Sequence, residues 1–365
     1  MEPEEARQLE PEGRPCSDSG PPDGSVPLVS VILPVHNGEA WLDECLHALL
    51  AQTFLSRHER WSLELSAFDD GSSDGSWPKL TAWAAPLHAH GIRTRLGRSG
   101  AARGGGCGYA KNRAVRQSRG AWLCFQDVDD VMLPSRVATQ LDAARDRPSA
   151  LLGARVRREP PESTPRYIRW ANAMSDDELV LHRFRECTLL MPTWFIGREA
   201  FDAVGGFREE PCEDLLFLQA HVARGGALHR AGGEEPLVVY RYHEHAATHG
   251  IARRTIFRHR AEAIERSVLG GWPRFTIWGA GRDGRDFFKC LSGASRARVV
   301  AFCDVDPKKI GTEYVYEQYR VPVVHFSAAE PPFVTCVALD RTGGAFEKNL
   351  ASLGLTEGVD YYHFC

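Results

Sequence analysis

The chain has 365 residues, with 44 Lys and Arg against 48 Asp and Glu, and a formal net charge of −4. This length allows two domains with room for a small third one. No apolar run reaches the roughly 20 residues of a membrane-spanning helix, so we expect no membrane insertion. The ten cysteines are scattered without a CxxC pair, which favours free thiols over a disulfide framework or a zinc site.

Residues 1–26 are acidic and rich in proline, and they contain no apolar segment of the kind found in secretory signals. Such a composition cannot bury a core, so we expect a disordered tail. Together with the free thiols, this predicts a cytoplasmic protein, with the nucleus as the alternative.

Residues 27–250 alternate between strand and helix patterns. Val29–Leu33 is an apolar strand that leads into the turn Pro34-Val35-His36-Asn37-Gly38, and Glu39–Ala51 has helical spacing. Trp61–Phe68 is the next strand, followed by Asp69-Asp70-Gly71-Ser72-Ser73-Asp74. The alternation predicts an α/β fold with a mostly parallel sheet. Alone, the Asp, Ser and Gly string is typical of a turn and helix cap, but after a strand it also lies where such sheets bind ligands.

A basic, glycine-rich region follows a short strand near Ile92–Leu96. Gly104–Gly108 precedes a helix over Tyr109–Arg119, and helix N-termini attract anions. No Asp or Glu occurs between Gly75 and Gln126, whereas the basic residues there are Lys79, Arg93, Arg95, Arg98, Arg103, Lys111, Arg113, Arg116 and Arg119. This block could neutralise phosphates of a nucleotide or polynucleotide; the alternatives are a solvated helix face and a merely flexible loop.

Three carboxylates come directly after the apolar run Ala121–Cys124, namely Asp127, Asp129 and Asp130. A short apolar run reads as a buried strand, so these acids should emerge together at its carboxyl end. Neighbouring carboxylates repel, and each favours a nearby cation. Hard oxygen ligands suit Mg²⁺ or Mn²⁺ carrying phosphate oxygens, while a solvated acidic turn is the alternative.

The rest of this region is less regular. A strand is expected at Ala150–Val156, and Arg157–Arg185 is polar and basic, typical of a lid or an acceptor-binding insertion. Glu213-Asp214 opens an apolar helix over Leu215–Val222, and Leu237–Tyr242 forms a last strand that ends at His243.

A second α/β unit is predicted after a helical linker at 251–271. Within residues 272–365, Phe275–Trp278 leads into Gly279-Ala280-Gly281-Arg282-Asp283-Gly284, and Asp304 follows a strand over Val299–Cys303. This is the spacing of a dinucleotide-binding βαβ unit. Because the module is too small for a dehydrogenase with its own substrate domain, we favour a Rossmann-like scaffold or partner-binding module over a functional NAD site.

Several motifs in register resemble one known family. They are Val31-Ile32-Leu33-Pro34-Val35-His36-Asn37-Gly38, Asp69-Asp70-Gly71-Ser72-Ser73-Asp74, Ala110-Lys111-Asn112-Arg113, Gln126-Asp127-Val128-Asp129-Asp130, Gly205-Gly206-Phe207, Glu213-Asp214 and Tyr240-Arg241-Tyr242-His243. Together they resemble the family 2 glycosyltransferases of the GT-A fold. The resemblance implies a hexosyltransferase that moves a sugar from a nucleotide-sugar to a hydroxyl with inversion at the anomeric carbon.

The resemblance also implies roles for residues around the donor nucleotide. Pro34, His36 and Asn37 would wall the nucleotide pocket, although His36 stands where the family more often has Tyr. Asp69 would accept the uracil N–H, since a carboxylate is a pure acceptor, or Asp70 could do so instead.

Further roles concern the diphosphate and its metal. Asp127 would hold the ribose, Asp129 would coordinate Mn²⁺ or Mg²⁺, and His243 would be a further metal or diphosphate ligand. Lys111 and Arg113 would contact the donor phosphates. For His243 a structural role is the alternative.

Asp214 is the candidate general base, because an inverting displacement needs a base within reach of the acceptor hydroxyl, opposite the leaving diphosphate. The alternative for Glu213-Asp214 is charge compensation at a helix N-terminus.

The C-terminal extension, Ile277–Gly284 with Phe302–Asp306, makes the chain similar to transferases that galactosylate queuosine in tRNA. This implies UDP-galactose as the donor and the anticodon nucleoside of tRNA-Tyr as the acceptor. The alternatives are transfer of N-acetylglucosamine to a glycan or protein, a catalytically silent RNA- or partner-binding module, and an oxidoreductase that uses Gly279–Gly284. The oligomeric state is left open.

Overall fold

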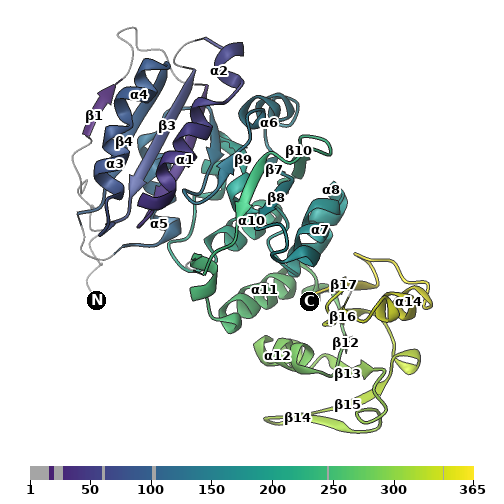
Figure 1. The fold of residues 1–365 in the computed structure, drawn as a ribbon. Coiled ribbons are helices and arrows are strands. Elements are labelled where there is room, and N and C mark those ends of the chain that lie inside the picture. The colour runs from purple at the N-terminus through teal and green to yellow at the C-terminus, as the bar shows by residue number, and fades with distance from the viewer. Residues whose placement is uncertain (1–15, 20–27, 60–61, 101–103, 245, 340) are drawn as a thin grey trace, which may run out of the picture. The chain divides into compact units, whose positions relative to one another are not determined.

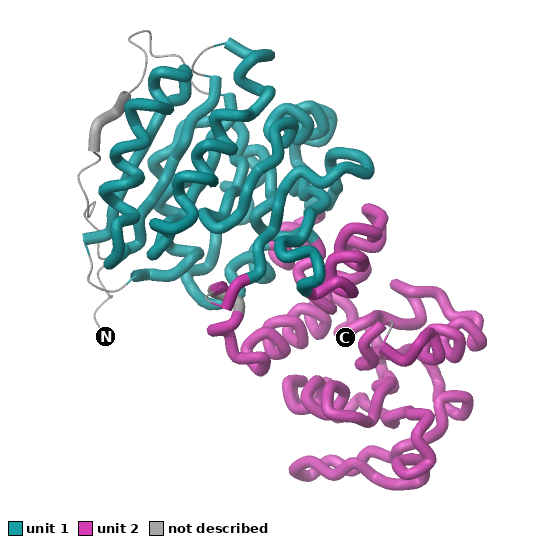
Figure 2. Tube along the Cα trace, in the orientation of Figure 1, with its two compact units in different colours: residues 1–163, 189–217, 226–242 teal, residues 164–188, 218–225, 243–365 magenta. Residues whose placement is uncertain are grey.

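The computed structural model describes residues 16–19, 28–59, 62–100, 104–244, 246–339 and 341–365. They divide into two compact units (Figure 2). The first unit comprises residues 1–163, 189–217 and 226–242, and the second comprises 164–188, 218–225 and 243–365. The domain boundaries drawn from the sequence stay a prediction.

The first unit is built on an eight-stranded sheet in the order β1-β4-β3-β2-β5-β9-β7-β10 (Figure 1). Its strands are β1 (Cys16–Ser19), β2 (Val29–Val35), β3 (Leu63–Asp69), β4 (Ile92–Arg98), β5 (Trp122–Phe125), β7 (Leu151–Ala154), β9 (Phe195–Gly197) and β10 (Leu228–Ala231). The pairs β2–β3, β2–β5, β3–β4 and β7–β10 are parallel, whereas β1–β4, β5–β9 and β7–β9 are antiparallel. The mostly parallel α/β sheet predicted from the sequence is confirmed.

Strand β1 lies inside the segment for which we predicted a disordered tail. It pairs antiparallel with β4, which would otherwise form the edge of the sheet with unpaired backbone groups. Residues 1–15 and 20–26 of that predicted tail lie outside the described residues.

Helices cover both faces of this sheet. The helices of the first unit are α1 (Glu39–Leu50), α2 (Phe54–Arg57), α3 (Ser76–Ala82), α4 (Ala84–Ala89), α5 (Cys107–Gln117), α6 (Arg136–Arg145), η2 (Met191–Thr193) and α9 (Arg198–Val204), and α10 (Glu213–Ala223) belongs to both units. Alternate residues of β3, such as Leu63 and Leu65, join an apolar core with α1, α3, α4 and α6.

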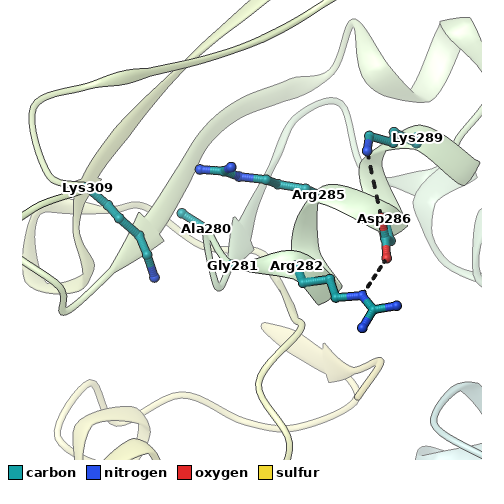
Figure 3. Close-up of a pocket in the computed structure, with 7 residues that line it drawn as sticks. All are labelled: Ala280, Gly281, Arg282, Arg285, Asp286, Lys289 and Lys309. Carbon is teal, nitrogen blue, oxygen red and sulfur yellow. Dashed lines mark ion pairs between the residues drawn. The ribbon is translucent and has the colours of Figure 1, made fainter.

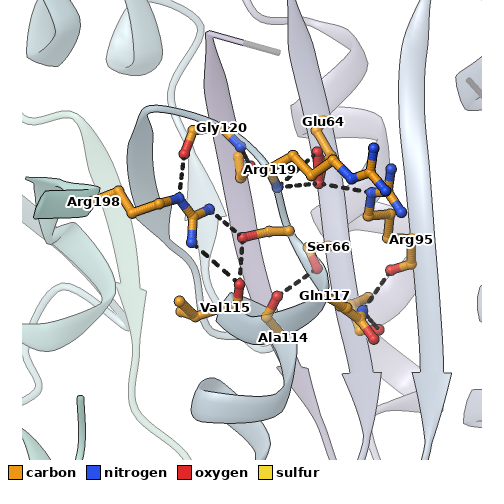
Figure 4. Close-up of polar contacts among 12 residues, drawn as sticks. Glu64, Ser66, Arg95, Ala114, Val115, Gln117, Arg119, Gly120 and Arg198 are labelled. Carbon is orange, nitrogen blue, oxygen red and sulfur yellow. Dashed lines mark hydrogen bonds and ion pairs between the residues drawn. The ribbon is translucent and has the colours of Figure 1, made fainter. Parts of the chain in front are cut away.

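The other face of β3 carries polar side chains toward α5 (Figure 4). Ser66 Oγ donates to the Ala114 carbonyl at 2.7 Å, and Gln117 Nε2 donates to the carbonyls of Ala67 and Arg95 at 2.9 and 2.8 Å. These bonds fix α5 on the sheet by directional contacts, so the residues at its start are held in place relative to the strand ends.

Glu64, the second polar residue on that face of β3, is fully buried. It accepts the Arg119 backbone N–H at 3.2 Å, and Arg95 Nε lies 3.5 Å from its carboxylate. Burial raises the pKa of Glu64, and Arg95 opposes that shift. Part of the basic block therefore serves to compensate a buried acid of the sheet.

A three-stranded sheet in the order β6-β11-β8 completes the first unit, with β6 (Val131–Met132), β8 (Val156–Glu159) and β11 (Val238–Arg241). The single strand predicted at Ala150–Val156 is thus two strands, β7 and β8, in different sheets. Since β6 follows the acidic residues directly and pairs with β11, this small sheet anchors the acidic loop.

The second unit has a six-stranded sheet in the order β14-β15-β13-β12-β16-β17. Its strands are β12 (Phe275–Trp278), β13 (Val299–Asp304), β14 (Glu313–Tyr316), β15 (Tyr319–His325), β16 (Phe333–Thr335) and β17 (Tyr361–His363). Its helices are α7 (Pro165–Ala173), α8 (Asp176–Leu181), η1 (His182–Phe184), η3 (Ala247–Gly250), α11 (Arg253–Ser267), η4 (Leu269–Gly271), α12 (Arg282–Cys290), α13 (Gly293–Arg296), η5 (Phe326–Ala328) and α14 (Ala345–Ala351). The predicted β12–α12–β13 unit is present, with β12 and β13 parallel.

Helices α11 and α12 pack on one face of this sheet, and α14 packs on the other. Ile277 lies in the core formed with α11 and α12, whereas the next residue, Trp278, packs with Phe346 of α14. Among the described residues, no helix is both long and apolar enough to cross a bilayer.

The glycines after β12 have distinct roles. Gly279 has φ +113°, a conformation that favours glycine. A Cβ on Gly284 would collide with the Gly279 carbonyl oxygen. The strand and helix therefore approach one another at a distance that only glycine permits.

Replacing Gly284 by Ala is expected to destabilise the protein by about 1–3 kcal/mol, because the added methyl group must push α12 away from β12. Urea unfolding followed by circular dichroism measures the change. Gly293→Ala is the control, since its Cβ would approach only the Tyr319 hydroxyl, at 3.4 Å. Equal unfolding midpoints for Gly284→Ala and the wild type would contradict the packing described.

Candidate active site

The three carboxylates predicted from the sequence meet at the carboxyl end of β5. Asp127, Asp129 and Asp130 each offer an oxygen, and these atoms all lie within 4.8 Å of one another. We call residues 126–130 the acidic loop. Because β5 is parallel to β2, the loop lies at the same sheet edge as the turn after β2.

A buried arginine supports the acidic loop. Arg136 is fully buried, and it donates to Gln126 Oε1 at 2.5 Å and to the Phe125 carbonyl at 2.6 Å. Gln126 Nε2 in turn donates to the carbonyls of Asp127 and Asp130, both at 2.8 Å. The network fixes the loop backbone and places a positive charge beside the carboxylates.

Asp130 has a carboxylate that is only partly satisfied. The residue is 1% exposed, and Oδ1 accepts the Arg241 backbone N–H at 2.8 Å. Oδ2 is buried and has no hydrogen-bond partner among the described residues. Burial, followed by the charges of Asp129 and Asp127, raises the pKa of Asp130 well above its usual range. A buried oxygen of this kind calls for a proton or a cation.

The charges of Asp127 and Lys111 stabilise one another beside the acidic loop. Burial raises the pKa of Asp127 to about 6, opposed by Lys111 and reinforced by Asp129. Lys111 is buried, with Nζ 2.8 Å from Glu213 Oε1. Burial lowers the pKa of Lys111, but Glu213 and Asp127 outweigh it and the net shift is upward. Lys111 is therefore a permanent cation next to the acidic loop.

These residues fit a divalent cation. The donor set is composed of carboxylate oxygens, which Mg²⁺ and Mn²⁺ prefer, and the buried Asp130 Oδ2 is unsatisfied in the described residues. Asp129 and Asp130 are the carboxylates that would hold the ion, with Asp127 beside them.

The acidic residues at the end of β3, Asp69 and Asp70, have protein partners. Asp69 Oδ1 accepts the Ser72 N–H at 2.9 Å, and Asp69 Oδ2 lies 3.0 Å from Arg98 Nε. Both Asp70 oxygens accept backbone N–H groups of Gly105–Gly106, at 2.9 and 2.8 Å. The glycine loop is therefore held by Asp70. Since both carboxylates are buried, uracil recognition by either would require displacement of a neighbouring group.

The turn after β2 is tied to the same loop. His36 Nδ1 lies 2.9 Å from the Asp70 carbonyl oxygen, and the Asn37 N–H donates to Ser72 Oγ at 2.9 Å. Asn37 has φ +51°, which Asn tolerates better than most residues. His36 and Asn37 are exposed and Pro34 is half-buried, so these three side chains remain accessible for the predicted nucleotide contacts.

The acidic loop and this turn touch directly. A Cβ on Gly38 would lie 2.8 Å from Val128 Cγ1, so the first helix can begin at this distance from the loop only with glycine. The motif after β2 and the motif after β5 thus form one continuous site edge.

Comparison with known proteins finds similarity to the family that the sequence motifs resemble. Residues 30–205 match the sequence model described as Glycosyl transferase family 2. Over these residues the chain is similar to family 2 glycosyltransferases. It is 25% identical over 192 residues to an uncharacterized glycosyltransferase of Rickettsia conorii, a match covering 50% of this chain and 29% of that protein. It is also 25% identical over 167 residues to TuaG of Bacillus subtilis, a putative teichuronic acid biosynthesis glycosyltransferase, covering 45% of this chain and 62% of TuaG.

Solved structures share the GT-A fold of this chain. S. aureus TarS in complex with UDP aligns with a TM-score of 0.50 and 18% identity, over 73% of this chain and 70% of that one. The mannosyltransferase PcManGT of Pyrobaculum calidifontis, in complex with GDP-Man and Mn²⁺, aligns with a TM-score of 0.51 and 18% identity, over 69% and 68% of the two chains. The chain spans less than a third of the length of the Rickettsia conorii relative.

Asp214 lies on the first turn of α10, in the first unit. Its Oδ1 accepts the N–H of Leu215 at 2.7 Å, and it follows Glu213, the partner of Lys111. Glu213 packs against the start of α5, since a Cβ on Gly108 would lie 3.1 Å from the Glu213 Cβ. Asp214 therefore lies next to the residue that pairs with Lys111.

Among the described residues, at least five of the nine cations of the basic block pair with acids inside the first unit. Arg113 Nη1 lies 3.1 Å from Glu209 Oε1, and Asn112 exchanges two hydrogen bonds with the backbone of Phe207, at 2.8 and 2.9 Å. Arg95, Arg98 and Lys111 pair with Glu64, Asp69 and Glu213. Donor binding by Arg113 would have to compete with Glu209.

His243 is the first residue of the third segment of the second unit and is half-buried. The role predicted for it, as a metal or diphosphate ligand, stays a prediction.

The second unit holds another group of potential ligands, namely His182, Glu357 and His363. Trp170 Nε1 donates to His182 Nδ1 at 3.1 Å, and since indole can only donate, the proton of neutral His182 is on Nε2. That nitrogen lies 3.2 Å from Glu357 and is closed to a metal. Burial lowers the pKa of His363 to about 3, so this ring is neutral. We interpret the group as a structural cluster.

Sequence reasoning missed Arg241, although it noticed the Tyr240-Arg241-Tyr242-His243 motif. The Arg241 backbone binds Asp130, and its Nη1 donates to the Asp129 carbonyl at 3.2 Å. Its Nη2 donates to Glu44 at 2.6 Å, and the guanidinium lies over the Trp41 ring at 5.0 Å. An arginine at the end of an apolar strand was the only available signal.

Mn²⁺ affinity is expected to rise between pH 5 and pH 7. The raised pKa values of Asp127 and Asp130 mean that these carboxyls keep their protons to a higher pH than usual, and protons compete with the cation. Isothermal titration calorimetry in two buffers of different ionisation enthalpy measures affinity and proton release together. A pH-independent affinity without proton release would contradict the predicted ligand set.

Arg241→Met is expected to weaken Mn²⁺ binding about tenfold, because it removes the guanidinium that holds the Asp129 backbone while leaving all carboxylates in place. Arg208→Met is the matched control, since its exposed side chain pairs with Glu210 at the surface and has no contact with the acidic loop among the described residues. If both variants bound Mn²⁺ like the wild type, Arg241 would have no positioning role.

Proposed function

We propose that the chain is an inverting, metal-dependent glycosyltransferase that uses a UDP-sugar. The observation that carries the proposal is the acidic loop at the sheet edge, with three carboxylates within 4.8 Å and one buried, unsatisfied oxygen. A divalent ion bound there would act as a Lewis acid toward the donor diphosphate. The Mn²⁺ complex of PcManGT, which has the same fold, supports such an ion.

The residues of the site have complementary tasks in this proposal. Asp129 and Asp130 hold the cation, and Asp127 binds the ribose. Lys111 is kept charged by Glu213 and adds positive charge where the diphosphate departs. Asp214 accepts the proton of the acceptor hydroxyl as that oxygen attacks the anomeric carbon. Because attack and departure occur on opposite faces, a single displacement inverts the carbon.

For the donor we propose UDP-galactose, and for the acceptor queuosine in the anticodon of tRNA-Tyr. The similarity of the C-terminal extension to queuosine-galactosylating transferases supports both, and the UDP complex of TarS supports a uridine nucleotide. Such an acceptor requires the enzyme to be in the cytoplasm or the nucleus.

Helix α7 offers features that suit an RNA acceptor. Arg166 and Arg169 are exposed one turn apart on this helix. The neighbouring Trp170 packs against His182 and Arg185, so it is not available to stack on a base. Tyr167 is half-buried and lies beside the Trp170 ring at 5.8 Å, and its exposed part is the aromatic surface of α7 that could do so.

Asp214→Asn is expected to lower turnover by about 10²–10⁴-fold, because the amide cannot accept the acceptor proton. Donor binding should stay within about twofold of the wild type, since Asp214 is assigned no donor contact. A UDP-release assay measures turnover and calorimetry measures UDP binding. Glu210→Gln, at an exposed position nearby, is the control. Unchanged turnover of Asp214→Asn would remove Asp214 from the mechanism.

The acceptor is tested by incubating the protein with Mn²⁺, labelled UDP-sugars and total tRNA from queuosine-replete and queuosine-depleted cells. We expect label from UDP-galactose in the replete tRNA alone, because only that pool contains the proposed hydroxyl. Label in neither pool, together with sugar transfer to a glycan or protein, would contradict the acceptor but not the transferase chemistry.

A further inference from the structure

The second unit contains a cavity that the proposed transferase chemistry does not use (Figure 3). Its volume is about 370 Å³. The lining residues are Ala280, Gly281, Arg282, Arg285, Asp286, Lys289 and Lys309. We call it the basic pocket, because four of these seven residues are cations. A volume of this size is that of a small-molecule site.

The single acid of the lining, Asp286, has its shortest ion pair with an arginine outside the pocket. Asp286 Oδ2 lies 2.5 Å from Nη1 of Arg253, which does not line the cavity. Its contacts with the lining cations are looser, at 3.7 Å to Arg282 and 3.8 Å to Lys289, as Figure 3 shows. Arg253 also pairs with Asp283 at 2.6 Å, so it is shared between two carboxylates. Arg282 and Lys289 therefore have only a loose share of one carboxylate between them among the described residues.

Arg285 adds a third charge. Among the described residues, no carboxylate lies within ion-pair distance of it. Its guanidinium lies over the Tyr314 ring at 5.2 Å, which orients the side chain without neutralising it. In Figure 3 it extends toward the side of the cavity where Lys309 stands. With four cations and one carboxylate in its lining, the pocket favours an anion.

The acid after β13 is not free to bind a ribose. Asp304 Oδ1 accepts the N–H groups of Val305 and Asp306 at 2.8 and 3.0 Å. Its Oδ2 accepts the Ala280 N–H and the Lys309 ammonium, both at 2.9 Å. In a dinucleotide site, a carboxylate at this position holds the ribose hydroxyls. Here both oxygens of Asp304 already accept hydrogen bonds from the protein. The pocket can therefore recognise the phosphate of a ligand but not its ribose through Asp304.

The backbone leaves room for a ligand to approach. A Cβ on Gly281 would meet nothing within 4 Å, in contrast to Gly279 and Gly284, where it would collide with backbone atoms. Residues 279–284 are thus closely packed against the protein at Gly279 and Gly284. At Gly281, which lines the cavity, the backbone is open.

We propose that the basic pocket binds a phosphate-bearing small molecule, held chiefly by Arg285 and Lys289. It does so as an anion site and not as a nicotinamide dinucleotide site. The proposal is independent of the transferase function, since the pocket lies wholly in the second unit.

The test is calorimetric titration of the full chain with inorganic pyrophosphate in EDTA, which removes divalent ions and with them the cation-dependent donor site. We expect one pyrophosphate per chain, with a dissociation constant that rises with salt. R285Q/K289Q should weaken binding about tenfold or more, because two charge-assisted contacts are lost. R320Q is the matched control, because Arg320 is an exposed arginine of the same unit outside the pocket, and it should bind like the wild type. Melting curves check folding, and the single variant K289Q replaces the double variant if the latter is unstable.

UDP, NAD⁺ and a short RNA distinguish the sources of the phosphate. We expect UDP to bind in EDTA with the same sensitivity to R285Q/K289Q, and NAD⁺ to bind no more tightly than UDP. No pyrophosphate binding in EDTA, or equal affinity for the wild type and R285Q/K289Q, would overturn the proposal. RNA binding that depends on Arg285 without any pyrophosphate binding would overturn it too. Loss of sugar transfer in any variant does not bear on these outcomes.

Discussion

The site depends on the balance of charge around three crowded carboxylates. Side chains that approach within 4.8 Å of one another in a closed environment resist ionisation, and the raised pKa values of Asp127 and Asp130 express that resistance. The protein supplies positive charge from Arg136 below the acidic loop and from Lys111 beside it. Neither hydrogen-bonds to Asp130 Oδ2, and this remaining deficit is what makes a cation the natural partner of the site.

The surrounding motifs serve largely to keep this arrangement in place. Both carboxylate oxygens of Asp70 accept hydrogen bonds from the glycine-rich loop at Gly105–Gly106. Asn37 joins the turn after β2 to the loop after β3. Asn112 holds the backbone of Phe207, next to the segment that leads to Glu213 and Asp214. Residues that a motif comparison would assign to ligand binding are therefore partly framework, and the exposed members, His36 and Asn37, are those that remain open to a nucleotide.

The fold could be predicted well where the signal is local. The alternation of apolar runs with helical spacing gave the parallel strands β2, β3, β4 and β12 to within two or three residues, and acids after an apolar run correctly predicted their meeting at the sheet edge. Helix α8 was missed although Ser175 and Glu178 form a capping box, a signal readable in the sequence. Strand β1 has no apolar pattern in the sequence. It is defined by its backbone pairing with β4, which a local sequence pattern does not reveal.

The charge pairs of the site could not be predicted, because their members are far apart in the chain. Lys111 and Glu213 are 102 positions apart, and Arg113 and Glu209 are 96 apart. An acid-free stretch therefore looked like an open phosphate-binding surface, whereas much of it compensates acids from other elements. The role of Arg241 could not be predicted for the same reason, because its contact with Asp130 joins positions 111 residues apart.

The most direct test of the account is the anomalous diffraction of manganese in crystals soaked with Mn²⁺ and UDP. We expect one strong peak within coordination distance of the Asp129 and Asp130 carboxylates and of the diphosphate of UDP. A manganese peak elsewhere, or UDP bound away from the acidic loop, would contradict the assignment of this sheet edge as the active site.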